Sequence, residues 1–297
     1  DQRQNWLCEK TLLAVILSCQ HCKHYRGNRK GSNQSGHTLA SVARETATSL
    51  AADSPVLAIF KEAARKLNER QDRHERLVKL SRDITIESKR IIFLLHSPIT
   101  KESSENTLTE AKDRIQKLIN GPIKSIGLEL ESSPAHLHSR AVTAGFQEFI
   151  EARTLYSLMA TKKIITYPEV QKEFEFCITD DDCQRLVVTM LSETDYMLGL
   201  ADLTGELMRK AINSISSGDS EECFQACQVV RDLYTGYLGG RLLIRKLPTT
   251  RANVNKVEMA VYALRVRGGE APAPLLLAAA PIDWDANVHL SDDEGYY

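Results

Sequence analysis

The chain has 297 residues, of which 42% are hydrophobic, and its formal net charge is -1. This length suits one large domain or two small ones, and the apolar content is enough to fill a core. The near-neutral balance excludes a global attraction to nucleic acid, so contact with a polyanion has to come from local patches. The seven irregularly spaced cysteines are a poor disulfide framework and favour a reducing compartment. No stretch approaches the roughly 18 apolar residues of a membrane span, so no membrane is expected as a partner.

Residues 1–53 differ from the rest of the chain and are expected to be a disordered leader. Cys19, Cys22 and His24 in this segment could serve as zinc ligands, but a closed site needs a fourth ligand at a sensible spacing. At the other end, residues 271–297 combine Pro/Ala steps with acidic residues and are expected to be a disordered tail. Residues 54–270 remain as the folded domain.

The folded region is predicted to contain seven helices. Asp53-Ser54-Pro55 predicts a helix start, because a capping residue precedes a proline, and residues 56–96 contain no Gly or Pro. A second helix over about 105–131 is expected to kink or break at Gly121-Pro122. Further helices are expected at about 132–162, from 167, and at 192–217, 220–237 and 250–267. Asp180-Asp-Asp-Cys183 is expected to form a loop, and no β-period is found, so the sequence predicts an all-α bundle.

A basic stripe follows the first helix and consists of Arg73, Arg76, Lys79 and Arg82. It could be a solvated face with intrahelical ion pairs. It could also be a track for phosphates. The spacing alone leaves both interpretations open.

The third and fifth helices each combine an apolar stripe with a pair of acids. On a helical wheel the stripes face the core, and they consist of Val142, Phe146, Phe149, Ile150 and Tyr156 in one helix and of Tyr196, Leu200, Leu203, Leu207 and Ala211 in the other. Glu148 and Glu151 are placed on the other side of their helix, with Ala144 and Leu155. The opposite face of the fifth helix is predicted to carry Asp195, Gly199, Asp202, Glu206, Arg209 and Asn213.

The two acid pairs could be ordinary solvated side chains, or they could bind a metal. Carboxylates from two neighbouring helices would be suitable ligands for Mg²⁺, which prefers oxygen and keeps several waters for substrate phosphates. Gly199 and Gly205 lie inside the fifth helix, where glycine costs stability unless something must approach closely. The sequence predicts that a close contact is made there.

Four stretches resemble the translin family: residues 76–96, Phe146-Gln-Glu-Phe-Ile-Glu-Ala152, residues 195–209 and residues 257–268. The resemblance implies an all-α subunit of seven helices that assembles into a hollow hetero-octamer. It also implies an Mg²⁺-dependent endoribonuclease, with Mn²⁺ as a substitute. The family's catalytic acids match Glu148 and Glu151 in the first motif and Asp202 and Glu206 in Ala201-Asp-Leu-Thr-Gly-Glu206. Translin itself lacks this set, so the resemblance is to the catalytic branch of the family.

The resemblance further implies partners and a setting. Translin is the expected partner subunit, and the expected substrate is single-stranded RNA, with single-stranded DNA as an alternative ligand. Roles in RNA silencing (passenger-strand removal) and in processing of tRNA precursors would place the protein in the cytoplasm and nucleus. The acid-bearing helix faces would line the internal chamber, and the basic stripe would be a phosphate track. The alternative function is a non-catalytic scaffold that binds translin. Sequence-specific DNA binding has little support, because the sequence contains no base-reading motif.

Overall fold

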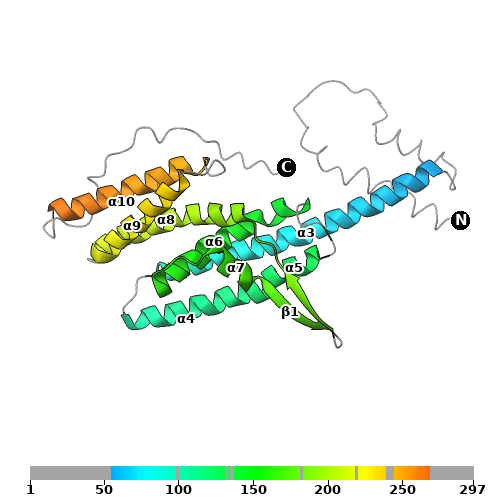
Figure 1. Ribbon diagram of the computed structural model, residues 1–297, viewed down its shortest axis with the longest axis horizontal. Helices are drawn as coiled ribbons and strands as arrows, with labels where there is room; N and C mark the ends of the chain where they lie inside the picture. The colour runs from blue at the N-terminus through cyan, green and yellow to red at the C-terminus, as the bar shows by residue number, and fades with distance from the viewer. Residues whose placement is uncertain are drawn as a thin grey trace, which may run out of the picture. The chain divides into compact units, whose positions relative to one another are not determined.

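The computed structural model describes residues 55–97, 101–131, 133, 137–180, 183–217, 220–238 and 244–267 (Figure 1). The predicted leader, its zinc-ligand candidates and the predicted tail lie outside these residues. Contacts between residues divide the chain into a first unit that ends at Leu77 and a second unit that begins at Val78. The acid-bearing helices belong to the second unit.

Helices make up most of the described chain, as the sequence predicts. They are α3 (Pro55–Leu95), α4 (Lys101–Leu118), the π-helix η2 (Ile119–Ile123), α5 (Lys124–Leu130), α6 (Ser139–Thr161), α7 (Tyr167–Glu173), α8 (Glu193–Ser217), α9 (Ser220–Tyr237) and α10 (Leu247–Arg267). Helix α6 begins later than predicted. Helix α10 begins earlier, because the Thr250 N–H already donates to the Lys246 carbonyl at 2.9 Å. Of the helices in the described ranges, none is long and apolar enough to cross a bilayer.

The break predicted at Gly121-Pro122 is a five-residue π-turn, η2. Proline has no N–H to donate and its ring collides with the carbonyl four residues earlier in a regular helix, and the wider π-turn accommodates it. Two hydroxyls bond to carbonyls of this turn: Ser125 donates to Gly121 at 3.0 Å and Thr189 donates to Ile123 at 2.9 Å. The helix therefore changes its winding here and continues into α5.

The prediction that the chain contains no β-strand is wrong, because residues 175–188 include an antiparallel hairpin. Strand β1 (Glu175–Asp180) pairs with β2 (Cys183–Val188), and Phe176 lies opposite Val187. Both of these side chains are buried, whereas Leu186 and Val188 are exposed. This alternation is the period of two that a half-buried strand requires. The hairpin is the exception to an otherwise helical fold.

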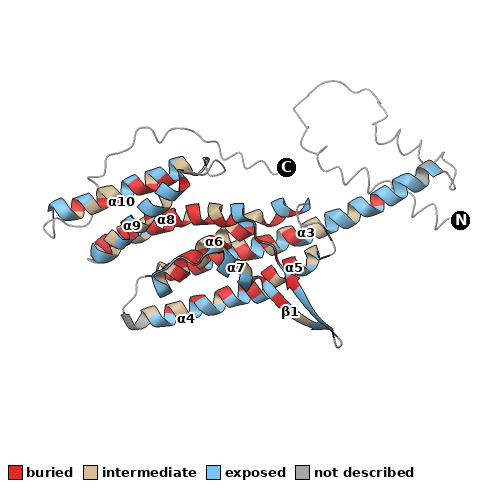
Figure 2. Cartoon of the chain, in the orientation of Figure 1, coloured by how far each residue is buried: buried red, intermediate tan, exposed pale blue. Residues whose placement is uncertain are grey.

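Helix α8 packs against α6, α9 and α10 (Figures 1 and 2). Its C-terminal half shares a core of mostly small side chains with the last two helices, consisting of Ala211, Ile215, Cys223, Ala226, Cys227, Val257, Ala260 and Ala263. Around α6 the core is aromatic, and the ring centroids of Phe146 and Phe149 lie 5.8 and 5.5 Å from that of Phe174. Small side chains let helices approach closely, whereas the aromatic cluster fills a wider space.

Gly199 lies at a close contact between α8 and α6. A Cβ atom at this position would lie 2.6 Å from the carbonyl oxygen of Gln147 and 2.7 Å from Cβ of Ile150. The close contact predicted at this glycine is therefore present. At Gly205 an added Cβ would meet only Asn253 Nδ2, at 3.7 Å, which is an ordinary contact distance, so no close approach explains that glycine.

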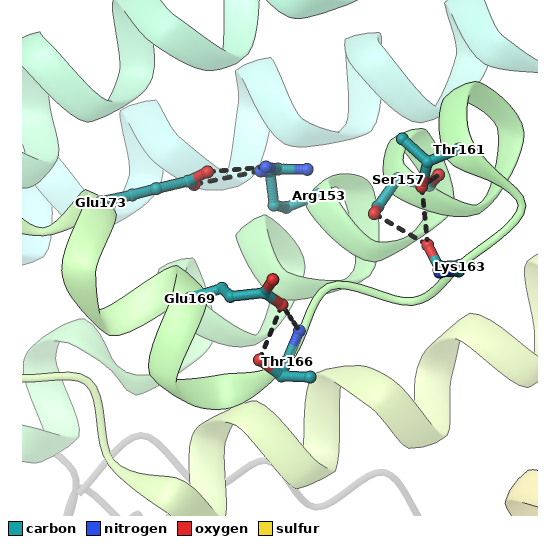
Figure 3. Close-up of polar contacts among 7 residues, drawn as sticks. All are labelled: Arg153, Ser157, Thr161, Lys163, Thr166, Glu169 and Glu173. Carbon is teal, nitrogen blue, oxygen red and sulfur yellow. Dashed lines mark hydrogen bonds and ion pairs between the residues drawn. The ribbon is translucent and has the colours of Figure 1, made fainter.

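The C-terminal end of α6 is fixed by polar contacts (Figure 3). Lys162 adopts the left-handed conformation that ends many helices, with φ of 59°. The hydroxyls of Ser157 and Thr161 donate to the Lys163 carbonyl at 2.8 and 3.3 Å. Helix α6 therefore ends in a defined turn.

Two further polar contacts, also drawn in Figure 3, fix the position of α7: one links it to α6, and the other caps its first turn. Arg153 of α6 binds both carboxylate oxygens of Glu173, at 3.1 and 2.6 Å. The backbone N–H and the hydroxyl of Thr166 both donate to Glu169, at 2.8 and 2.7 Å. This arrangement caps the start of α7, and these hydrogen bonds hold the pKa of Glu169 below its ordinary value. Helix α6, which carries Glu148 and Glu151, is thereby anchored at its far end.

Candidate functional site

A pocket of about 390 Å³ lies between α6, α8 and the start of α10. It is lined by Glu148, Glu151, Ala201, Asp202, Gly205, Lys246, Thr249, Thr250 and Asn253. Three of the four predicted acids therefore meet at one place, although they come from two helices. The sequence predicts this convergence only through the family resemblance.

Glu206, the fourth acid, is buried beside the pocket and does not line it. One of its carboxylate oxygens lies 2.7 Å from Nε2 of His96, which follows the end of α3, and 3.1 Å from a guanidinium nitrogen of Arg209. The side chains of His96 and Glu206 are only 9% and 11% exposed. Glu206 thus ties α8 to the end of α3.

The electrostatic centre of the pocket is Glu151. Burial raises its pKa to about 8, and repulsion from Glu206, Asp202 and Glu148 adds to the effect, while the Lys246 ammonium opposes it. Repulsion from all three other acids means that the four charges lie close together. A raised pKa in a pocket of like charges is characteristic of functional sites.

Two lysines bind the acids that line the pocket. Nζ of Lys246 lies 2.7 Å from Oδ1 of Asp202, and Nζ of Lys89 on α3 lies 3.2 Å from Oε1 of Glu148. Neither lysine is predicted from the sequence, because each lies far along the chain from its partner. His96 is likewise missed, although it ends one of the stretches that resemble the translin family.

The wheel prediction that the acid face of α8 points away from the core is wrong for several positions. Asp195 and Glu206 are 7% and 8% exposed, and Gly199 is packed against α6. Asp195 accepts hydrogen bonds from the Gln147 amide at 3.0 Å and from the Ser192 hydroxyl at 2.9 Å. Helix α8 has neighbours on more than one side, so two of its faces are buried.

On α6, the helical wheel predicts that Leu155 lies on the same side as the acids, yet Leu155 is fully buried. Glu148 and Glu151 are both only partly exposed. The side of this helix that carries the acids is therefore partly covered within the single chain, before any assembly with other subunits.

The donor set of the pocket suits a hard cation, since carboxylate oxygens are the ligands that Mg²⁺ prefers. A positive ion would also relieve the repulsion that raises the pKa of Glu151. In the part of the chain that the structure describes, however, no three His, Cys, Asp or Glu side chains are arranged as metal ligands. Glu148 and Asp202 are paired with lysines, and Glu206 with a histidine and an arginine, instead. The residue types in the pocket fit Mg²⁺, but the ion would have to compete with the basic side chains for the carboxylates.

The predicted basic stripe lies along α3. Arg76, Lys79 and Arg82 are exposed and Arg73 is half-buried; the first unit contains Arg73 and Arg76, and the second contains Lys79 and Arg82. The α3 residue that contacts the pocket acids is Lys89, two turns beyond Arg82. A phosphate track along the stripe stays a prediction.

The sequence from residue 72 to residue 268 matches the model of the Translin family. An all-α chain whose acids converge between two helices thus belongs to the translin family. Among curated proteins it is similar to translin-associated protein X of Mus musculus, with 39% identity over 75% of this chain and 83% of the relative. The homolog of that protein in Schizosaccharomyces pombe is 31% identical, over 68% of this chain and 84% of the relative. Translin of Homo sapiens is 27% identical over 42% of this chain and 50% of its own length.

Solved structures show the same fold at low sequence identity. The crystal structure of apo-NeC3PO is 22% identical, with a TM-score of 0.52 over 70% of this chain and 96% of that chain. The structure of an AfC3PO–duplex RNA complex is 18% identical, with a TM-score of 0.51 over 71% and 99% of the two chains. The family and the fold class predicted from the sequence are both confirmed.

Proposed function

We propose that this chain is the catalytic subunit of an Mg²⁺-dependent endoribonuclease that acts together with a translin-type partner. The observation that carries the proposal is the pocket in which Glu148, Glu151 and Asp202 meet. Burial, together with repulsion from the neighbouring acids, raises the pKa of Glu151 there to about 8. The names of its relatives support the setting: one is associated with translin, and a structure of the same fold contains duplex RNA. Assembly into a hollow hetero-octamer is part of this proposal.

The four acids would have different tasks. Glu148 and Asp202 present their carboxylates to the pocket and would hold the ion. A bound Mg²⁺ would polarise a water molecule for attack and would neutralise charge on the phosphodiester. Glu151, which lines the pocket together with these two acids, would hold or release a proton at its carboxyl group as a general acid or base. Glu206, bound to His96, would hold α8 in position.

The alternative is a non-catalytic subunit that binds translin and nucleic acid as a scaffold. A specific observation favours it: Asp202 and Glu148 form ion pairs with Lys246 and Lys89. Carboxylates that are paired in this way can be purely structural, because an opposite charge stabilises a partly buried acid.

The test is RNA cleavage by the co-purified complex with its translin-type partner. Single-stranded RNA should be cut in Mg²⁺ or Mn²⁺ and left intact in EDTA. Asp202→Asn should lower the rate by about a hundredfold or more. Glu193→Gln is the matched control, because Glu193 is an exposed acid in the first turn of the same helix, and it should leave the rate unchanged. Full cleavage by an intact Asp202→Asn complex would favour the scaffold.

The nature of the substrate follows from the same assay. Single-stranded RNA, duplex RNA and single-stranded DNA of one sequence should be compared, and single-stranded RNA should be cut fastest. Passenger strands and tRNA precursors are the proposed physiological substrates, and the RNA-silencing machinery in the cytoplasm and nucleus is the proposed setting. A preference for single-stranded DNA would redirect the proposal toward another substrate class.

A further inference from the structure

Lys246 has an unusual position for a lysine, because its ammonium group lies in the acid pocket. It is the single basic residue among the residues that line this pocket in the described part of the chain. Its Nζ lies 2.7 Å from Oδ1 of Asp202, and the two side chains are 36% and 33% exposed. The pocket therefore contains three carboxylates and one ammonium.

The backbone of Lys246 is fixed by the start of α10. Its carbonyl accepts the N–H of Thr250 at 2.9 Å and the hydroxyl of the same residue at 2.9 Å. These two bonds form the first turn of the helix and set the direction in which the lysine leaves the chain. The ammonium is thus placed by secondary structure and does not depend on a freely moving loop.

The second lysine that binds a pocket acid differs from Lys246. Lys89 pairs with Glu148 at 3.2 Å, and its side chain is 64% exposed. An ion pair that is so exposed is worth little, because water and salt screen it. Lys246 is closer to its acid and more enclosed, so it is the principal counter-charge of the pocket.

We propose that Lys246 is a positioning residue that competes with a divalent cation for the carboxylate of Asp202. The inference rests on the proposed function, because it presumes that a cation enters the pocket. In EDTA the ammonium offsets the repulsion among the three carboxylates. When a cation binds, Asp202 exchanges the ammonium for the ion. The lysine thereby lowers the affinity for metal and stabilises the pocket when metal is scarce.

The experiment uses the purified complex with its translin-type partner and compares wild type, Lys246→Met, Lys246→Arg and Lys256→Met. Lys256 is an exposed lysine of the same helix and serves as the control. Binding of Mn²⁺ alone is measured by electron paramagnetic resonance of the free ion. Lys246→Met should bind Mn²⁺ about fivefold more tightly, the fold-change that corresponds to a partly exposed ion pair of about 1 kcal/mol.

Thermal unfolding supplies a second measurement that does not depend on activity. In EDTA, Lys246→Met should unfold at a lower temperature than wild type, and Lys246→Arg should restore the midpoint because it keeps the charge. Saturating Mg²⁺ should remove most of the difference. Equal Mn²⁺ affinity in wild type and Lys246→Met would overturn the competition, while the proposed nuclease would stand. Absence of Mn²⁺ binding in both proteins would refute the metal-dependent function, and the competition with it.

Discussion

Replacing Gly199 with alanine tests whether the distance between α6 and α8 is set by contact with the main chain. The new Cβ atom would lie 2.6 Å from the Gln147 carbonyl oxygen, 2.7 Å from Ile150 Cβ and 2.9 Å from Ile150 Cγ2. Atoms at these positions cannot swing aside, because one belongs to the backbone and the others to a β-branched side chain. The two helices have to move apart.

The net cost follows from two opposing effects. Overpacking a well-packed contact costs about 1–3 kcal/mol, and replacing glycine with alanine inside a helix returns about 1 kcal/mol. The expected net loss is up to roughly 2 kcal/mol, which lowers the unfolding midpoint of a domain of this size by up to roughly 8 °C. RNA cleavage should fall as well, because Asp202 on α8 moves relative to Glu151 on α6.

Gly205→Ala is the matched control on the same helix. Its Cβ would meet only Asn253 Nδ2, at 3.7 Å, so the gain in helix propensity of up to about 1 kcal/mol should dominate. Both variants are compared by thermal unfolding of the complex at one fixed protein concentration, since assembly makes the midpoint depend on concentration. If Gly199→Ala is as stable as Gly205→Ala, the main-chain contact does not set the spacing.

Two further changes test the electrostatics. Glu151→Gln in EDTA should stabilise the complex by an amount that grows as the pH rises from 5 to 8. The reason is that folding holds the pKa of Glu151 at about 8 against an ordinary 4.5, so the wild-type complex loses stability over this pH range, up to a limit of roughly 5 kcal/mol. A gain in the unfolding midpoint that is equal at every pH would contradict the raised pKa. Arg153→Met should lower the unfolding midpoint by several degrees, since this side chain is 14% exposed and binds Glu173 through two nitrogens. The control Arg231→Met removes an exposed ion pair and should change the midpoint little. Equal losses in the two variants would argue against the role of burial.

The helical part of the fold could be predicted from the sequence because its signals are local. Pro55 opens a helix, Gly121-Pro122 interrupts one, and apolar residues recur at helical spacing through α6 and α8. The hairpin escaped prediction, since its apolar residues form short runs and Phe176 meets Val187 only after the chain has turned. Its inner face is buried through contacts with α5, which no local pattern reveals.

The candidate site could be predicted only in part. The motif of the translin family identified the four acids, but a helical wheel assigns one buried face to each helix. Helix α8 has several neighbours, so Asp195 and Glu206 are buried on the side that the wheel gave to solvent. Lys246 and His96 reach their acids across 44 and 110 residues of chain, and a charged residue in a connector gives no sign of such a partner.

The π-turn at Gly121-Pro122 also affects how the chain can change in length. Position 122 follows Ile115 by two regular turns and would face the core in an unbroken α-helix. The wider turn places Ile123 there instead: Ile123 is fully buried, as is Ile126 beyond it, while Pro122 stays partly exposed. The turn therefore absorbs an inserted residue, and the apolar side of α5 stays in register with that of α4. A related chain that is one residue shorter at this point could run straight through as an ordinary helix and bury the same face.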